Sequence, residues 1–279
     1  NSLHAESDKI DHIIKGFLID NGFYEVINNP FVQKSNNESI KVDNPLDSNR
    51  EFLRTDLKKS LINNLLYNER RQKDSVKLFE ISDIYIQGKR SKKKMLGIIA
   101  SGRVGRNYED FSKKINNNYL ESILKEIMLE VSFNPENISR NELNSKSKNS
   151  VSYLEIELDE FSSKIKNYQS FCKPPSTFIK YKPISEFPSS TRDISFSVKD
   201  PSRLNLLEDS ILNYKHDLLK EVFIFDYYNN EKMREIKIGF RFIFQSNITT
   251  ITDTEVSKVV DTIINKSVTI DSVTIPGLN

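Results

Sequence analysis

The last third of the chain carries the pattern that most restricts its fold. TRDISFSV alternates the apolar residues Ile194, Phe196 and Val198, which predicts a strand, and Asp200-Pro201 opens a helix. Strand patterns follow in LLKEVFIFDYY and IKIGFRFIF, then a helix pattern in TDTEVSKVVDTII and a final strand pattern in SVTIDSVTI. The order strand, helix, strand, strand, helix, strand predicts a ferredoxin-like α/β sandwich.

Capping signals mark several helix limits. Thr252 with Glu255 forms a capping box at the start of the last helix. Ser7 is the expected N-cap of an amphipathic first helix that ends at Gly22. Thr55 is the expected N-cap of a second helix, whose apolar face is formed by Leu57, Leu61, Leu65 and Leu66.

A proline-rich stretch divides the chain. Cys172 to Pro188 holds four prolines and no helical pattern, so we predict a domain at 1–172, a linker at 173–184 and a second domain at 185–279. In the first domain, SVKLFEISDIYI and MLGIIASG predict an antiparallel hairpin whose solvated loop tip holds Lys92–Lys94, and a helix and the strand VSYLEIEL follow. The overall fold class is α+β.

Composition excludes several function classes. The single cysteine, Cys172, rules out an internal disulfide framework and a cysteine-based metal cluster. With 41 basic and 39 acidic residues the net charge is +2, so any RNA binding must rest on local geometry. The polar start and short apolar runs predict a cytoplasmic chain with no membrane contact. The absence of an initiating Met suggests a fragment or a processed chain.

No catalytic constellation is present in the sequence. His4, His12 and His216 lie far apart without metal-ligand spacing, and no Ser or Cys sits in a nucleophile elbow. Neither a P-loop nor a GxGxxG motif occurs. We therefore predict no catalytic residue and no metal site in this chain.

The chain resembles a known family along nearly its whole length. NPLDSNREFLRTDLKKSLINNLLYNERR and VKLFEISDIY resemble the catalytic-like core of the beta subunit of bacterial phenylalanine-tRNA ligase. GFYEVINNPFV before them and DFSKKINNNYLESIL after them stand in the family's order. KPISEFPSSTRDISFSV, VFIFDYYNN and TITDTEV resemble its ferredoxin-fold anticodon-binding domain. The resemblance implies a class II synthetase-like antiparallel sheet with helices in the first domain.

The resemblance also implies where the chemistry lies. In the family the alpha subunit binds ATP, phenylalanine and the acceptor end of tRNA, and arginines clamp the ATP phosphates in class II synthetases. KLFEISDIY has no arginine, and no Gly-rich arginine motif follows. We expect a scaffold for the alpha subunit in an assembly of two alpha and two beta chains. ATP and Mg²⁺ would serve that holoenzyme and would not bind this chain. The editing and oligonucleotide-binding modules of the family's N-terminal half have no counterpart here.

The expected binding residues come from the family's Phe-Asp-x-Tyr motif, whose Asp and Tyr contact anticodon bases. They fall on Asp226 and Tyr228, and single-stranded bases do stack on aromatic rings and offer donors to carboxylates. Family members carry basic residues at points where this chain has none, and Lys237 and Arg241 are the expected substitutes. Tyr227 is expected in the core or at its rim. The residues alone favour a simpler reading, in which Tyr227 and Tyr228 cap the sandwich core and Asp226 lies in a turn, and the resemblance reverses this for Tyr228.

Two other functions fit parts of the pattern. A stand-alone RNA-binding protein would keep the anticodon domain without a catalytic partner, and it would carry polar residues where a subunit has an apolar interface. A single-chain organellar-type synthetase would join a catalytic core to the same domain, but the missing arginines argue against it. The expected partners of the leading reading are the alpha subunit and tRNA(Phe).

Overall fold

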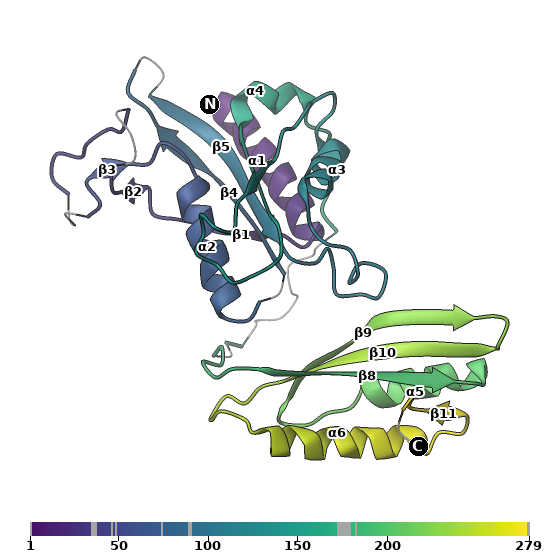
Figure 1. The fold of residues 1–279 in the computed structure, drawn as a ribbon. Coiled ribbons are helices and arrows are strands. Elements are labelled where there is room, and N and C mark those ends of the chain that lie inside the picture. The colour runs from purple at the N-terminus through teal and green to yellow at the C-terminus, as the bar shows by residue number, and fades with distance from the viewer. Residues whose placement is uncertain are drawn as a thin grey trace. The chain divides into compact units, whose positions relative to one another are not determined.

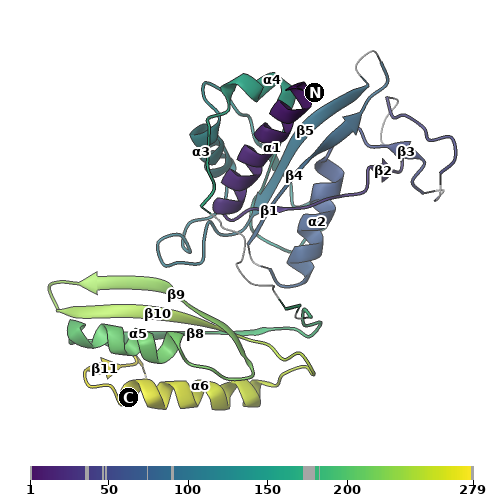
Figure 2. The same ribbon diagram turned by 180° about the vertical axis from the view of Figure 1, so that it is seen from behind.

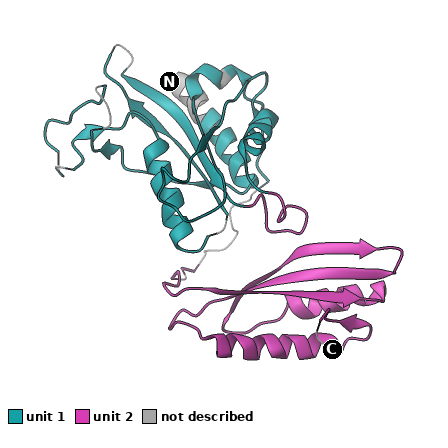
Figure 3. Cartoon of the chain, in the orientation of Figure 1, with its two compact units in different colours: residues 1–102, 114–178 teal, residues 103–113, 179–279 magenta. Residues whose placement is uncertain are grey.

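The structure is a computed structural model that divides into two compact units. Unit 1 comprises residues 1–102 and 114–178, and unit 2 comprises Arg103–Lys113 together with Ile179–Asn279 (Figure 3). The described residues are 2–34, 38–45, 47, 49–73, 75–88, 91–171, 180–181 and 183–277, with the backbone alone described for 2–8 and 162. Most of the predicted linker, 173–179 and 182, lies outside them. The inclusion of Arg103–Lys113 in unit 2 was not anticipated.

Unit 1 is built on a five-stranded sheet in the order β1-β4-β5-β7-β6. Its strands are β1 (Tyr24–Glu25), β4 (Val76–Tyr85), β5 (Lys92–Ser101), β6 (Glu136–Ile138) and β7 (Val151–Glu157). Neighbouring strands run antiparallel except at the edge, where β1 pairs with β4 in parallel. A separate ribbon consists of β2 (Phe31–Val32) and β3 (Phe52–Leu53). The predicted antiparallel sheet is confirmed.

Helices cover both faces of this sheet. They are α1 (Ser2–Asp20), α2 (Lys58–Arg70), α3 (Asn117–Ile127), α4 (Leu158–Phe161) and the 3₁₀ turn η1 (Ser162–Lys164). One face carries α2, and the other carries α1 with α3 and α4 (Figures 1 and 2). The double cover explains why β5 is buried at every position from Leu96 to Ser101. Gly97 is required beneath α2, because a Cβ there would lie 2.8 Å from a Leu61 methyl group.

The predicted loop tip at Lys92–Lys94 is wrong, because these residues begin β5. Each lysine lies beside a carboxylate: Lys92 is 2.9 Å from Asp83, and Lys94 is 2.6 Å from Asp11. Lys93 lies 2.7 Å from Glu157. The lysines extend the hairpin because partners distant in sequence neutralise their charge.

Two predicted N-caps are also wrong. α1 begins at Ser2 and passes through Ser7. α2 begins at Lys58 with Leu57 at the N-cap position and no capping side chain from that residue. The Leu57 N–H instead donates to both carboxylate oxygens of Glu155, each at 3.2 Å. The Glu155 carboxylate from β7 takes the place of the expected cap at Thr55, together with Asp56, whose side chain accepts from the Lys59 N–H at 3.4 Å. The predicted stop at Gly22 is confirmed, since α1 ends at Asp20 and Gly22 has a φ of 80°.

Unit 2 is a sheet with helices on one face (Figures 1 and 2). The strands, in the order β11-β8-β10-β9, are β8 (Ser190–Val198), β9 (Leu219–Asn230), β10 (Glu235–Phe244) and β11 (Val273–Thr274). The helices are the 3₁₀ turn η2 (Pro201–Arg203), α5 (Leu204–Leu212) and α6 (Asp253–Val268). This confirms the ferredoxin-like sandwich and the capping box of Thr252 and Glu255.

The core of unit 2 lies between the sheet and its two helices. Alternate residues of β8 and β10 point into it, among them Phe196, Phe240 and Phe242, which are fully buried. Leu207 and Ile211 of α5 and Val256 of α6 complete that layer. The last strand is shorter than predicted, because α6 continues to Val268 and only Val273–Thr274 pairs with β8.

Candidate nucleic-acid interface

The sheet of unit 2 has one face that no helix covers, and we call it the open face. Its residues follow from the strand register, because side chains opposite one another across a pair of strands point to the same side. The open face consists of Thr191, Asp193, Ser195 and Ser197 of β8, Glu235, Lys237, Gly239, Arg241 and Ile243 of β10, and Glu221, Phe223, Phe225, Asp226, Tyr228 and Asn230 of β9.

All four residues predicted to bind the anticodon lie on this face. Tyr228 is directly opposite Lys237, and Asp226 is opposite Gly239. Arg241 is opposite Phe223 on one side and Asp193 on the other. The register therefore brings the four side chains together on the one accessible side of the sheet. Tyr227 points the other way and packs against the core cluster, as expected for a core or rim residue.

Three of the four side chains are available to a ligand. Tyr228 is 58% exposed, and Asp226 and Lys237 are exposed as well. Among the described residues, none of the three has a hydrogen-bond or ion-pair partner. They offer an aromatic ring, a carboxylate acceptor and an ammonium donor on neighbouring positions. This combination suits a stacked base with a nearby phosphate.

Arg241 differs from the other three because the protein already binds it. Its Nε and Nη2 atoms lie 2.7 and 2.6 Å from the two carboxylate oxygens of Asp193, a bidentate pair. Its guanidinium also lies 5.5 Å from the ring centre of Phe225. Only 19% of the side chain is exposed. Arg241 is therefore fixed by contacts within the protein, and it borders the three side chains that a ligand can reach.

A β-bulge shapes the centre of the open face. The register of β9 against β10 shifts between Gly239 and Phe240, which leaves Phe225 as an extra residue. The bulge lets Phe225 and Asp226 face the same side although they are consecutive. Gly239 makes room for them, because a Cβ there would lie 2.9 Å from the Phe225 ring and 3.1 Å from the Asp226 Cβ.

Phe225 and Asp193 are parts of this site that the sequence patterns did not indicate. The strict alternation expected of a strand hid the bulge at Phe225. For Asp193 a signal existed, since the alternation of TRDISFSV places it opposite the apolar set, as Arg241 is in IKIGFRFIF. An antiparallel pairing of these two strands predicts that Asp193 lies opposite Arg241.

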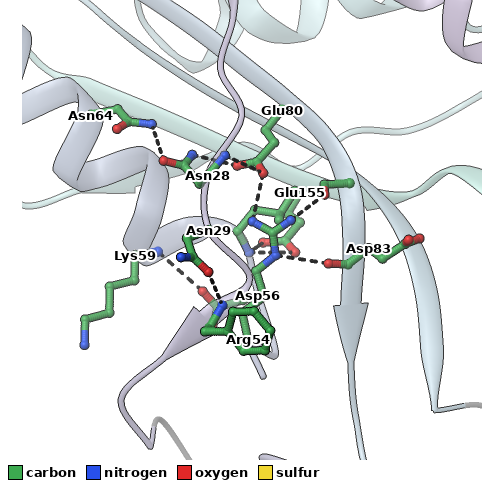
Figure 4. Close-up of polar contacts among 12 residues, drawn as sticks. Asn28, Asn29, Arg54, Asp56, Lys59, Asn64, Glu80, Asp83 and Glu155 are labelled. Atoms are coloured by element: carbon green, nitrogen blue, oxygen red, sulfur yellow. Dashed lines mark hydrogen bonds and ion pairs between the residues drawn. The ribbon is translucent and has the colours of Figure 1, made fainter. Parts of the chain in front are cut away.

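Unit 1 contains a second polar cluster, which is buried (Figure 4). Arg54 Nη1 lies 2.8 Å from a Glu80 oxygen, and these side chains are only 3% and 1% exposed. Arg54 also donates to the Asp83 carbonyl at 3.0 Å and to the Ser82 hydroxyl. Asn28 donates its side-chain amide to Glu80 at 2.7 Å. Every strong donor has a partner inside the unit, so the cluster fastens strands together and is closed to a ligand.

Glu155 lies close to this cluster, at the N-terminus of α2. Burial raises the pKa of its carboxyl, against the lowering effect of hydrogen bonds from Tyr153 and from the Leu57 N–H. Burial and the neighbouring Glu155 charge raise the pKa of the Tyr153 hydroxyl. A carboxylate at a helix N-terminus satisfies free backbone donors there. Its role here is to cap α2.

The pocket in unit 1 offers little chemistry. A pocket of about 240 Å³ at the start of α3 is lined by neutral side chains, namely Asn116, Asn117, Asn118, Asn137, Ser150 and Ser152. Within the described ranges, no group of three His, Cys, Asp or Glu side chains is arranged to hold a metal ion. In the same part of the chain, no helix is long and apolar enough to cross a membrane.

Two family models match the sequence. The model described as the phenylalanyl tRNA synthetase beta chain CLM domain matches residues 2–153, and the ferredoxin-fold anticodon binding domain matches residues 185–270. The second match covers the strands that form the open face.

Curated relatives are similar over almost all of this sequence. The phenylalanine-tRNA ligase beta subunit of Fusobacterium nucleatum is 27% identical, over 92% of this chain and 37% of that protein. The beta subunit of Aquifex aeolicus is 26% identical, over 90% of this chain and 36% of its own length. The chain thus spans little more than a third of the curated relatives it matches. The solved structure of pyrrolysyl-tRNA synthetase from Desulfitobacterium hafniense is 15% identical with a TM-score of 0.40, over 55% of this chain and 66% of that one, a likeness too low to argue from.

Proposed function

We propose a function from one premise: the chain belongs to the family of phenylalanyl tRNA synthetase beta chains. In this proposal it is a non-catalytic part of phenylalanine-tRNA ligase. Unit 2 binds the anticodon of tRNA(Phe), and unit 1 is a scaffold for the catalytic alpha subunit. The complete enzyme attaches phenylalanine to tRNA(Phe) at the expense of ATP.

The observation that carries the RNA-binding role is the gathering of Asp226, Tyr228 and Lys237 on the open face. Bases of a single-stranded loop are splayed out, so a free ring can stack on one of them. A carboxylate beside that ring accepts hydrogen bonds from a base edge, and this supports a choice among bases. Lys237 supplies a positive charge for a phosphate, which the nearly neutral chain as a whole does not supply.

Exposed apolar side chains support the scaffold role of unit 1. Tyr24 is 73% exposed and Ile27 is 91% exposed, in and just after the edge strand β1, and Phe31 follows at 42%. The amide of Asn64 on α2 donates to Asn28 at 2.9 Å, and Tyr67, one turn further along α2, is 56% exposed. A stand-alone RNA-binding protein would gain nothing from this surface, whereas a docked alpha subunit would bury it.

We assign the chemistry, ATP and Mg²⁺ to the alpha subunit and to the remainder of the assembly, with two alpha and two beta chains in the cytoplasm. In support, the buried arginine of the first unit, Arg54, is 3% exposed and paired with Glu80. It is not available to clamp a phosphate. The arginine of the open face, Arg241, is 19% exposed and is held by Asp193.

The experiment for the RNA-binding role is a set of three variants measured by fluorescence anisotropy with the anticodon stem-loop of tRNA(Phe). Tyr228→Ala is expected to weaken binding by about 1–3 kcal/mol, because one base stack is lost. Tyr228→Phe keeps the ring and is expected to bind like the wild type. Asp226→Asn is expected to change the preference between this stem-loop and that of another tRNA. Equal affinity of the Ala variant and the wild type would contradict the assignment.

The scaffold role has a separate test. Co-expression with the alpha subunit from the same source, followed by light scattering, is expected to give a complex of two alpha and two beta chains. Ile27→Glu places a charge on the exposed apolar segment and is expected to reduce complex formation. If the alpha subunit forms no complex with the wild-type chain, the result would favour the stand-alone RNA-binding protein.

A further inference from the structure

The open face carries more aromatic surface than its exposure reveals. Three rings of β9 point to that side, those of Phe223, Phe225 and Tyr228. Only Tyr228 is exposed, whereas Phe223 and Phe225 are half-buried although no helix lies over them. Another part of unit 2 must cover the two phenylalanines.

The cover is the loop Arg103–Lys113, through the single side chain of Phe111. The Phe111 ring centre lies 5.8 Å from that of Phe223 and 5.6 Å from that of Phe225, within the usual range for aromatic pairs. Phe111 is 5% exposed. The guanidinium of Arg241 lies 4.7 Å from the same ring, so Arg241 also packs against Phe111.

Further contacts fix the loop at this position. The guanidinium of Arg103 lies over the Phe111 ring at 3.9 Å and donates to the Phe111 carbonyl. Arg106 Nη1 lies 2.6 and 2.8 Å from the two carboxylate oxygens of Glu221. The Tyr108 ring lies 5.3 Å from that of Tyr227. The loop therefore contacts β9 through Arg106 and Tyr108 as well as through Phe111.

We propose that the Phe111 ring occupies the place where a further base would stack on Phe223 and Phe225, and thereby restricts the RNA site to Tyr228 and its neighbours. Aromatic rings stack with every base, so three adjacent exposed rings would bind single-stranded RNA with little regard to sequence. With two rings covered, the remaining stack lies between Asp226, which reads a base edge, and Lys237. The loop is thus a determinant of specificity. This inference rests on the RNA-binding role proposed above.

The loop also makes a positive contribution in this arrangement. Phe111 and Asp193 together hold the Arg241 side chain, and Phe225 beneath it adjoins Asp226 in sequence and in space. Removing Phe111 therefore has two opposite consequences. It uncovers Phe223 and Phe225 for stacking that does not depend on base sequence. It also removes one of the contacts that hold Arg241 beside the specific site.

The test compares the full chain with its Phe111→Ala variant, using a short single-stranded RNA of mixed sequence and the anticodon stem-loop. The variant is expected to bind the mixed-sequence RNA at least about fivefold more tightly, which corresponds to one new stack, and to discriminate less between the two RNAs. Phe111→Leu keeps an apolar cover and is expected to behave like the wild type. Unchanged or weaker binding of mixed-sequence RNA by a folded Ala variant would overturn the proposal.

A second measurement does not depend on the Ala variant remaining folded. The chain contains no tryptophan, so Phe111→Trp introduces a single indole, whose emission can be excited apart from that of the tyrosines, and keeps an aromatic ring in place. Its emission is expected to be that of a buried indole and to stay unchanged when the stem-loop binds. A red shift on binding would mean that RNA displaces the loop, which contradicts a permanent cover.

The two proposals fail in different ways. If Tyr228→Ala leaves stem-loop binding intact while Phe111→Ala still gains affinity for mixed-sequence RNA, the anticodon assignment is wrong and the covering role stands. If Tyr228→Ala weakens the stem-loop complex and Phe111→Ala gains nothing, the loop is a structural clasp only.

Discussion

The sheet of unit 1 has helices on both faces, whereas the sheet of unit 2 has helices on one face only (Figures 1 and 2). In each unit an arginine pairs with a carboxylate of the sheet, Glu80 of β4 in unit 1 and Asp193 of β8 in unit 2. Arg54 and Glu80 are 3% and 1% exposed, while Arg241 and Asp193 are 19% and 38% exposed. The first pair is enclosed with all its strong donors satisfied. The second borders free polar and aromatic side chains that a ligand can reach.

The cover over a sheet decides the role of its polar groups. A buried pair costs desolvation and remains only with complete hydrogen bonding, so it holds strands in place. A pair at an accessible face is screened by water and contributes little to stability, but it orients groups for recognition. The following predictions test this division.

The largest effect is expected in unit 1 from Arg54→Met. The substitution leaves the Glu80 carboxylate buried without its cation, which typically costs about 3–5 kcal/mol. Urea unfolding followed by circular dichroism measures the loss. The matched double variant Arg54→Met with Glu80→Leu removes both charges and is expected to recover most of it. If the single variant were as stable as the wild type, the pair would not differ from a surface ion pair.

A smaller loss is expected in unit 2 from Gly239→Ala. The new Cβ meets the Phe225 ring at 2.9 Å, and crowding of this kind costs about 1–3 kcal/mol. Displacement of Phe225 also moves Asp226, so binding of the anticodon stem-loop is expected to weaken. Thermal unfolding and anisotropy check the two effects. Ser195→Ala, at the exposed position opposite Gly239 on β8, is the control, and it should stay within about 0.5 kcal/mol of the wild type.

The smallest effect is expected in the pH dependence of the free energy of unfolding of unit 1. Burial raises the folded-state pKa of Glu155 above its unfolded value, so the folded chain takes up this proton first as the pH falls. The contribution of Glu155 to stability therefore grows as pH falls through the folded pKa, and it levels off below the unfolded pKa. Urea unfolding at pH 7 and pH 5 is expected to show that the wild type gains relative to Glu155→Gln. A difference between the two that is independent of pH would mean that burial does not govern this carboxyl.

Elements whose signals are local could be predicted from the amino-acid sequence. The strand alternation and the capping box of Thr252 and Glu255 predicted the sandwich of unit 2, because each needs only neighbours along the chain. The stop at Gly22 is equally local, since only a residue tolerant of positive φ suits that turn. The resemblance indicated Asp226 and Tyr228 as binding residues, and the register shows that they share a face with Lys237.

Features that join distant segments depend on the three-dimensional fold and could not be predicted from local patterns. Glu155 of β7 contributes a cap to α2, and the lysine run at the start of β5 pairs with the carboxylates of Asp83, Glu157 and Asp11. The bulge at Phe225 and the cover by Phe111 likewise depend on partners that no local pattern reveals. The physical reason is common to all of them. Charge compensation and aromatic packing act through short distances in space, and the chain pattern records only distances along the sequence.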